Sequence, residues 1–493
     1  MIRRSWRNFD FVLAGVLLLL AAYGVVMIYS ATINTLGLEN AVQRQIVYVI
    51  AGTAILVIVA SLDYHLLDMI QHPLPVLKPF VLGLIGMGLI ITLHMEQINP
   101  EDSMPSIGSF APDLPAIMSC LLAVFIVFFL DRSWLRNIDL PLARLGLSAL
   151  LLGAMAVAAF VASRSLPAGG LQANVVPYLV SLTLASVYLL DCLTLRFTDT
   201  LANPLYVLML ATLVILFVIG QVSGGAQRWL GAGTVQPSEL TKILLIIVLA
   251  KYLADHEESL NRFATVLTSL GIVVVPMALI YLQPDLGTAL SLAAIWTAMI
   301  WMAGIRFRHL LLLGGAVVAV LPLVWLNLES YMRQRIMLFI NPSGDPDSYF
   351  NVHQALVSIG SGGWTGKGLT QGSQSQLHFL RVRHTDFIFA VTAEELGFLG
   401  AAAMIVLIFS LLWRIVRVAE RARDPFGRLI AAGVGGLILF QSSINIGMNL
   451  GLMPVTGIPL PFVSYGGSSF LTLILGLGLV ESIAMRHKKL EFD

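Results

Sequence analysis

The sequence predicts an all-α, polytopic integral membrane protein with about fourteen transmembrane helices and both termini in the cytoplasm. Hydrophobic residues make up 57% of its 493 residues, whereas charged residues make up only 12%. A soluble domain carries about twice that share of charge. Unbroken apolar runs of roughly 17–25 residues, long enough to cross a bilayer as a helix, recur along the chain. Membrane barrels consist instead of short segments of alternating hydrophobicity, so the composition excludes them.

Each predicted span is an apolar run bounded by polar, charged or proline-containing residues. The first run has no small-residue cleavage site, so it predicts a retained helix rather than a signal peptide. Most Lys and Arg residues fall on segments that this order places in the cytoplasm, which agrees with the positive-inside rule. The predicted spans lie near residues 11–30, 45–62, 78–95, 114–131, 143–162, 174–190, 204–221, 237–253, 264–281, 286–304, 309–326, 387–412, 429–450 and 467–485.

The longest outer segment, residues 327–385, departs from this charge bias. Long polar loops in compact proteins are usually functional or disordered, and a mobile, solvated loop is one interpretation. Aromatic residues within the segment favour another, a loop that folds back onto the membrane face. Its cations are Arg333, Arg335, Lys367, Arg381 and Arg383.

Three predicted helices begin on the outer side with an acidic residue: Glu239, Asp285 and Asp386. Each carboxylate could simply favour or cap the start of its helix. Glu239 is also three residues from Lys242, so the two could form an ion pair that only fixes helix packing. Ionisable groups within a membrane are nevertheless candidates for function. Three acids and a lysine from different helices indicate a polar cavity near the outer rim of the membrane.

The segment around Asp386 is the most informative of the three. A carboxylate at the hydrocarbon boundary is costly unless it is paired, hydrated or used. Arg381, Arg383 and His384 closely precede it and suit a phosphate group. The sequence therefore indicates chemistry on an anionic lipid at this position.

Other polar residues within the predicted spans favour structural roles. Glu394 and Glu395 follow Asp386 within the same span, so we expect them to be hydrogen-bonded or paired with a cation. Asn445 and Asn449 share one helical face, a spacing that favours hydrogen bonds between helices.

Two outer connections supply further candidate residues. Residues 224–230 contain a glycine pair followed by Arg228. Residues 453–469 contain three prolines and a glycine pair, which predict a rigid re-entrant or surface loop. Backbone donors near Ser464 and Gly466 could approach a phosphate or sugar closely. The sequence has no nucleotide-binding glycine pattern and no zinc-ligand cluster. Neither an organic cofactor nor a nucleic-acid partner is expected.

Taken in order, these segments resemble the SEDS family (shape, elongation, division and sporulation), polytopic peptidoglycan glycosyltransferases of bacteria. The resemblance covers residues 1–65 and 200–485. Residues 366–369 and 372–374 are similar to the elongation, or RodA-type, branch of the family. The matching motifs are Gly225-Ala226-Gln227-Arg228-Trp229, Gln236-Pro237-Ser238-Glu239, Gln283-Pro284-Asp285-Leu286-Gly287-Thr288, His384-Thr385-Asp386-Phe387-Ile388-Phe389-Ala390, Glu394-Glu395-Leu396-Gly397 and Pro459-Leu460-Pro461-Phe462-Val463-Ser464-Tyr465-Gly466-Gly467-Ser468-Ser469.

The resemblance implies polymerisation of lipid II into glycan strands on the outer face of the bacterial cytoplasmic (inner) membrane during cell elongation. It also implies a class B penicillin-binding protein as transpeptidase partner and Asp386 as the essential catalytic carboxylate. The family has ten spans, so residues 70–197 are interpreted as four inserted helices between core regions 1–69 and 198–493. The residues expected to bind substrate are Arg228, Glu239, Lys242, Asp285, Arg333, Arg335, Lys367, Arg381, Arg383, His384, Ser464 and Gly466.

In the implied reaction, a sugar hydroxyl attacks an anomeric carbon while lipid pyrophosphate leaves. Asp386 is the candidate general base, because the hydroxyl is a weak nucleophile. Cations or a divalent ion, Mg²⁺ or Mn²⁺, would stabilise the pyrophosphate charge, although no acid cluster demands a metal. A lipid II flippase or transporter, and a scaffold for the transpeptidase, are the alternatives. A transporter often shows an internal repeat, and we find no convincing one.

Overall fold

The computed structural model divides the chain into two compact units. The first comprises Met1–Asp68, Thr234–Val273 and Asp285–Asp493, and the second comprises Met69–Gly233 and Val274–Pro284. Four predicted spans, near 78–95, 114–131, 143–162 and 174–190, lie outside the described residues. The structure describes residues 8–33, 38, 40–71, 203–219, 221–223, 226–229, 236–283, 285–326, 330–341, 346–377, 379–380 and 382–487.

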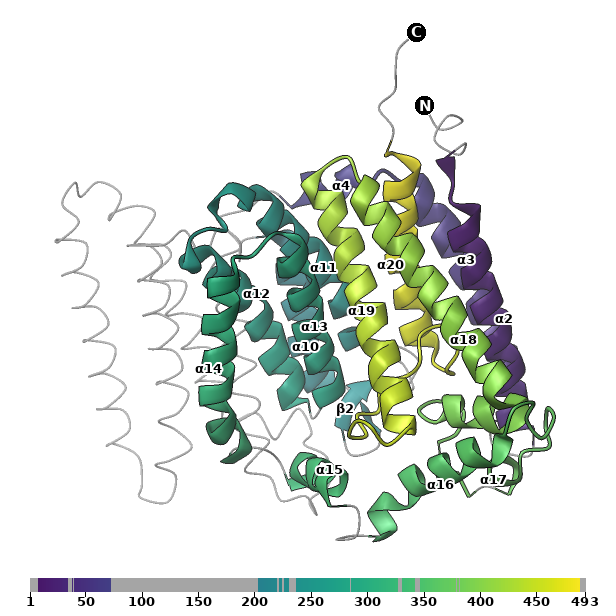
Figure 1. The fold of residues 1–493 in the computed structure, drawn as a ribbon. Coiled ribbons are helices and arrows are strands. Elements are labelled where there is room, and N and C mark those ends of the chain that lie inside the picture. Colours follow the sequence, from purple (N-terminus) through teal and green to yellow (C-terminus); the bar gives the residue numbers. More distant parts are fainter. Residues whose placement is uncertain are drawn as a thin grey trace, which may run out of the picture. The chain divides into compact units, whose positions relative to one another are not determined.

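The first unit is a bundle of apolar helices (Figure 1). The second unit contributes α10 (Pro204–Ile219) and a hairpin in which β1 (Gln221–Ser223) pairs antiparallel with β2 (Ala226–Trp229). The helices that lie or begin in the first unit are α2 (Phe11–Thr32), α3 (Ala41–Ser61), α4 (His65–Ile70), α11 (Pro237–Asp255), the 3₁₀ helix η5 (Glu257–Ser259), α12 (Phe263–Leu282), α13 (Leu286–Met302), α14 (Phe307–Leu326), α15 (Ser330–Ile340), α16 (Pro346–Gly362), α17 (Ser373–Gln376), α18 (Ile388–Arg421), α19 (Pro425–Asn449) and α20 (Gly467–Met485).

Every predicted span that falls on described residues coincides with a helix. Among the described helices, six are long and apolar enough to cross a membrane, namely α2, α3, α12, α18, α19 and α20. Shorter apolar stretches lie in α10, α13 and α14, while α11 carries Glu239, Lys242 and Lys251. The prediction of a helical, polytopic membrane protein is confirmed, and the short hairpin is an exception to its all-α character.

Small residues let the helices of the first unit approach closely. α20 packs mainly against α3, and α19 packs against α11, α13 and α18. A Cβ at Gly436 of α19 would lie 2.3 Å from the side chain of Ala298 in α13. A Cβ at Gly478 of α20 would lie 2.9 Å from Val59 in α3. Close contact at small residues is how helices associate in lipid, which is as apolar as the helices themselves.

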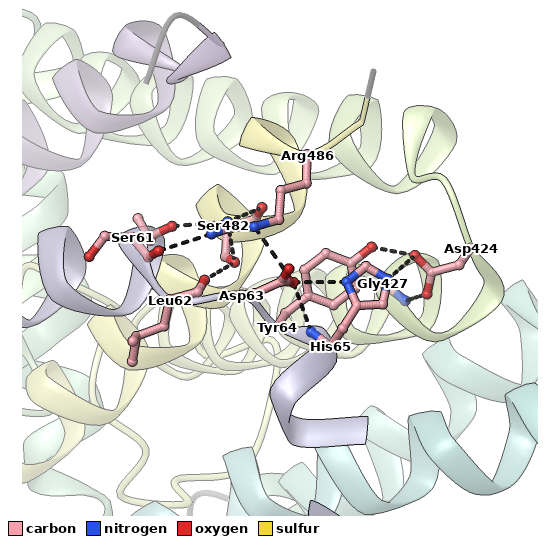
Figure 2. A network of polar contacts seen from close by, with 10 residues as sticks. Ser61, Leu62, Asp63, Tyr64, His65, Asp424, Gly427, Ser482 and Arg486 are labelled. Atoms are coloured by element: carbon pink, nitrogen blue, oxygen red, sulfur yellow. Dashed lines mark hydrogen bonds and ion pairs between the residues drawn. The ribbon is translucent and has the colours of Figure 1, made fainter. Parts of the chain in front are cut away.

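A polar network joins the ends of α3 and α20 to the start of α19 (Figure 2). The Tyr64 hydroxyl donates to the Asp424 carboxylate, which also caps α19 by accepting from Gly427 N at 2.9 Å. Arg486, just after α20, donates to the carbonyl of Ser61 at 2.9 Å. These bonds fix the end of the bundle at which α18 stops and α19 begins.

The segment 327–385, expected to be a polar loop on the outer side, is largely helical and contains α15, α16 and α17. On α16, Ala355 and Ser358 are fully buried, and Gly362 continues the same face at helical spacing. A Cβ at Gly362 would lie 1.9 Å from the carbonyl oxygen of Ala393, so α16 packs tightly on α18. The sequence hides this helix because its buried face is a narrow line of small residues rather than a broad apolar stripe.

Candidate functional site

Asp386 lies in a turn, residues 382–387, directly before α18, and its side chain is half-buried. Its backbone carbonyl accepts from the Nδ2 atoms of Asn445 and Asn449, each at 3.0 Å. Both asparagines are fully buried on α19. The sequence predicts that they bond between helices, and the structure shows that they bond from α19 to the turn that carries the acid.

The two residues before Asp386 are held by the connection between α19 and α20. Ser464 Oγ donates to the carbonyl of Thr385 at 2.5 Å, and Tyr465 N donates to the carbonyl of His384 at 2.9 Å. Three successive carbonyls of the turn therefore accept from groups far along the chain. Ser464 is buried, and its hydroxyl helps to position the turn through this hydrogen bond. Its predicted binding of substrate stays a prediction.

Arg383 anchors the same turn to α2. Its Nε donates to the carbonyl of Ala31 at 2.7 Å, and the residue is only 6% exposed. Ala31 lies in the last turn of α2, where the exposed carbonyl groups favour a cation. The fold therefore sets the position of Arg383, and its predicted contact with a phosphate group stays a prediction.

The turn places His384 and Asp386 in surroundings of low polarity. Burial raises the pKa of the Asp386 carboxyl group, while a hydrogen bond from Thr385 and the charge of Arg335 act in the opposite direction. Burial, helped by the charge of Arg383, lowers the pKa of His384. A raised pKa makes the Asp386 carboxylate a stronger base than a solvated aspartate.

A cavity of about 370 Å³ lies beside this turn, within the range of small-ligand sites. Phe387, next to Asp386, forms part of its wall, together with Arg335 of α15 and Tyr349 and Asn351 of α16. The sequence analysis did not identify Tyr349 and Asn351 as site residues. The pair of adjacent aromatic residues at 349–350 was the one local signal that could have pointed to them. The residues that line the cavity are Gln334, Arg335, Leu338, Phe339, Tyr349, Asn351, Val352, Phe387, Gly451, Met453, Pro454 and Val455.

Gly457 leaves space next to the carboxylate. Its φ is +71°, in the left-handed region that favours glycine, and a Cβ there would lie 3.8 Å from Asp386 Oδ2. On either side, the Thr456 carbonyl and the Ile458 side chain lie so close to the start of α13 that a Cβ at Gly287 would be 3.0 Å from each. This connection therefore joins the start of α18 to the start of α13.

The other two predicted acids also have defined partners. Lys242 Nζ lies 2.7 Å from Glu239 Oε1, and both residues are almost completely buried. Asp285 caps α13 by accepting from Thr288 N at 3.1 Å, and it also accepts from Gln236 Nε2 at 3.2 Å. The expected ion pair and the expected cap are both present. Within the described part of the chain, Glu239 Oε2 is buried without a hydrogen-bond donor.

The starts of α11, α13, α18 and α20 lie towards the same end of the first unit (Figure 1). Gln236 N donates to Ser468 Oγ at 3.1 Å, which joins the start of α11 to that of α20. Among the described residues, no group of three His, Cys, Asp or Glu side chains could hold a metal ion. These side chains do not fit a protein-held metal, so a role for Mg²⁺ or Mn²⁺ stays a prediction.

Lys367 belongs to a segment, residues 363–376, that we call the clasp. Gly397 interrupts α18 with a φ of +67°, which leaves nearby backbone groups without helical partners. The clasp pairs with them: Lys367 N donates to the carbonyl of Glu394 at 3.0 Å, and Phe398 N donates to the carbonyl of Gly363 at 2.8 Å. The clasp therefore completes a helix that its own sequence breaks.

Two fully buried glutamates hold the clasp through their side chains. Lys367 Nζ lies 3.0 Å from Glu394 Oε1, which also accepts from Gln374 N at 2.9 Å. Glu395 accepts from the Ser30 hydroxyl of α2. The structural role predicted for both glutamates is confirmed. Lys367, predicted to bind substrate, is engaged in this contact, and its binding of substrate stays a prediction.

The structure describes fewer contacts for the remaining residues predicted to bind substrate. Arg381 lies outside the described residues, and so does the side chain of Arg228 on β2. Arg333 is half-buried on α15. Gly466 lies directly before α20, at the end of the connection that holds the Asp386 turn.

Comparisons with known proteins identify relatives of this chain. Peptidoglycan glycosyltransferase MrdB of Escherichia coli (strain K12) is 40% identical over 296 residues, which cover 59% of this chain and 79% of MrdB. Stage V sporulation protein E of Bacillus subtilis (strain 168) is 39% identical over 280 residues, which cover 56% and 76%. A similar chain has been solved in a structure described as the structural coordination of polymerization and crosslinking by a peptidoglycan synthase complex. It matches with a TM-score of 0.51 and 29% identity, and the match covers 76% of this chain and 98% of the solved one.

The model of the family described as cell cycle protein, FtsW/RodA/SpoVE, matches residues 140–489. That range includes all the predicted site residues, from Arg228 to Gly466, and the turn, cavity and clasp described above. The chain belongs to the FtsW/RodA/SpoVE family.

Proposed function

We propose that the protein is a peptidoglycan glycosyltransferase that polymerises lipid II into glycan strands on the outer face of the cytoplasmic membrane during cell elongation. The observation that carries the proposal is the position of Asp386. Its backbone is fixed by α19, and the next residue, Phe387, lines a cavity that Arg335 also lines. Family membership supports the activity, since the MrdB relative is named a peptidoglycan glycosyltransferase.

In the proposed reaction, Asp386 is the general base. Its carboxylate accepts the proton of the acceptor sugar hydroxyl, and the hydroxyl oxygen bonds to the anomeric carbon of the donor. The bond from that carbon to the lipid pyrophosphate breaks, and its electron pair leaves with the pyrophosphate. The raised pKa of Asp386 suits this role, because a general base is most effective when its pKa approaches the working pH.

The leaving pyrophosphate needs positive charge nearby. Arg335 is exposed in the cavity wall, and its charge already acts on the Asp386 carboxyl group. The geometry therefore favours Arg335 for the pyrophosphate over Arg383, which is directed to α2. Mg²⁺ or Mn²⁺ bound to the pyrophosphate would add positive charge, and no step above depends on it.

A class B penicillin-binding protein is the proposed transpeptidase partner. The solved relative is part of a complex described as coordinating polymerization and crosslinking, which supports such a pairing. The basic residues at the opposite ends of the helices, which favour the cytoplasm, support an outward placement of the cavity.

The full chain, purified in detergent and supplied with lipid II, tests the proposal. We expect glycan polymer from the wild type and a rate at least about 100-fold lower for Asp386→Ala, the size of a general-base contribution. Asp255→Ala is the matched control, since Asp255 is exposed at the far end of α11. Polymer formed without a membrane to cross excludes pure transport, and wild-type rates from Asp386→Ala would refute the assignment of the base.

A further inference from the structure

A second pocket, of about 310 Å³, lies where α2 begins and where α18 and α20 end. It is therefore at the opposite end of α18 from the turn that carries Asp386. We call it the basic pocket. Its lining residues are Asn8, Phe9, Asp10, Phe11, Val12, Arg414, Arg417, Val418, Arg421, Ala484 and His487.

Three arginines lie along one face of α18 in this pocket, at helical spacing. Arg414 is balanced, since its Nε donates to Asp10 Oδ2 at 3.0 Å. Asp10 is engaged on its other side too: its side chain caps α2, and its backbone amide donates to Glu481 behind the pocket. Among the described residues, Arg417 and Arg421 form no ion pair. The pocket therefore has an excess of positive charge.

The border of the basic pocket is apolar and exposed. Phe11 is 74% exposed and Val12 is 55% exposed, although both lie at the start of an apolar helix. On α18, the Arg417 guanidinium lies 5.0 Å from the centre of the Trp413 ring, and Trp413 is itself half exposed. Tryptophan is enriched at membrane–water interfaces, where its ring meets both headgroups and acyl chains.

We propose that the basic pocket binds the phosphate headgroup of an anionic phospholipid, with Arg417 and Arg421 on the phosphate and acyl chains along Phe11 and Val12. Basic pockets between helices on the cytoplasmic side of a membrane are suited to such headgroups. A free phosphate ion would satisfy the arginines equally well. The adjoining exposed apolar residues, however, offer a surface that a ligand carrying hydrocarbon can cover and a free ion cannot.

Native mass spectrometry of the full, delipidated chain tests the proposal, with phosphatidylglycerol or phosphatidylcholine added at equal concentration. We expect the wild type to retain phosphatidylglycerol preferentially. The double variant Arg417→Ala/Arg421→Ala should bind it roughly 25-fold more weakly, at about fivefold for each arginine near an anionic headgroup. The control is Arg306→Ala/Arg308→Ala, which removes two exposed arginines before and at the start of α14. It should bind phosphatidylglycerol as the wild type does.

Each alternative result has a defined meaning. Equal retention of the two lipids, or equal loss in the test and control variants, overturns the proposal. Displacement of phosphatidylglycerol by excess inorganic phosphate would show a site for a free anion and would also overturn the lipid assignment. An acidic peptide that competes as strongly as the lipid would instead indicate a protein partner and count against it. An unchanged thermal unfolding midpoint of the lipid-free double variant shows that its fold is intact.

Discussion

Replacing Asn449 by alanine tests whether α19 positions the proposed base. Asn449 Nδ2 donates to the Asp386 carbonyl at 3.0 Å, and its Oδ1 accepts from Ala390 N at 3.2 Å in the first turn of α18. First-turn amides have no partner within their own helix. Asn449 is fully buried, so water is not at hand to replace either bond.

The magnitude follows from these two bonds. A buried donor left unpaired costs about 1–3 kcal/mol, and loss of the bond to the carbonyl adds about 1 kcal/mol. Asn449→Ala should therefore lower the free energy of unfolding by about 2–4 kcal/mol. Asn445 still donates to the same carbonyl, so the turn should shift rather than unfold. A misplacement of about 1 Å in a catalytic group costs roughly 100-fold in rate.

Initial rates of lipid II polymerisation over a range of substrate concentrations separate the two effects. We expect kcat to fall while KM changes by less than about twofold, because the base acts in the transition state. Asn449→Asp is the conservative comparison, since it keeps the acceptor for the Ala390 amide and loses the donor to Asp386. A loss of thermal stability with unchanged kcat would refute the reasoning, because Asn449 would then support the fold without positioning the base.

Three further predictions concern the kink, the buried ion pair and the pH profile. Gly397→Ala should lower the free energy of unfolding by at least about 2 kcal/mol in thermal unfolding, because φ is +67° and a Cβ would lie 2.3 Å from a clasp backbone nitrogen. Glu239→Gln should lower the free energy of unfolding, measured in denaturant, by about 3–5 kcal/mol, because Lys242 stays buried without its charged partner. The double variant Glu239→Gln/Lys242→Met should recover part of that loss. The kcat/KM should rise with pH through a pKa above that of an ordinary aspartate, because Asp386 acts after losing its proton. Arg335→Ala removes a charge that lowers this pKa, so the acid limb of the profile should move to higher pH.

Matched controls accompany these variants. Gly304→Ala also introduces strain, at a φ of +84°, but no atom lies within 4 Å of the new Cβ. It should therefore lower the free energy of unfolding by less than Gly397→Ala does. Lys251→Met breaks partly exposed ion pairs and should cost at most about 1 kcal/mol. Arg308→Ala removes an exposed charge from the start of α14 and should leave the pH profile unchanged. Effects of equal size in tests and controls would contradict the structural reasoning.

The membrane helices could be predicted because an apolar run of membrane length is a local signal. The family match confirms the resemblance to the SEDS family, which rested on short motifs spread over the chain. Helix α16 was not predicted, because its buried face includes Ala355, Ser358 and Gly362, small residues that no hydrophobic pattern distinguishes from a loop. The β1–β2 hairpin was not predicted, because its strands are shorter than the alternating pattern from which a strand is predicted.

The proposed site could be predicted in part. An acid at the mouth of a helix is visible locally, and so is the spacing that pairs Glu239 with Lys242. The groups that hold the Asp386 turn are not visible in this way, because Asn449 and Tyr465 reach it across a long stretch of chain. Likewise, hydrogen bonding of Glu394 could be expected, whereas its clasp partners depend on the backbone break in α18.

The dependence of the Asp386 turn on later segments has a consequence for biosynthesis. When α18 first leaves the ribosome and enters the membrane, the turn can make its contact with Ala31 of α2, but the other groups that hold it lie later in the chain. Asn445 and Asn449 follow with α19, and Ser464 and Tyr465 follow with the next connection. A nascent chain halted before Asn445 would therefore carry the carboxylate without any of these later hydrogen bonds. Catalytic competence should arise late in synthesis, after insertion of α19 and release of the segment that precedes α20.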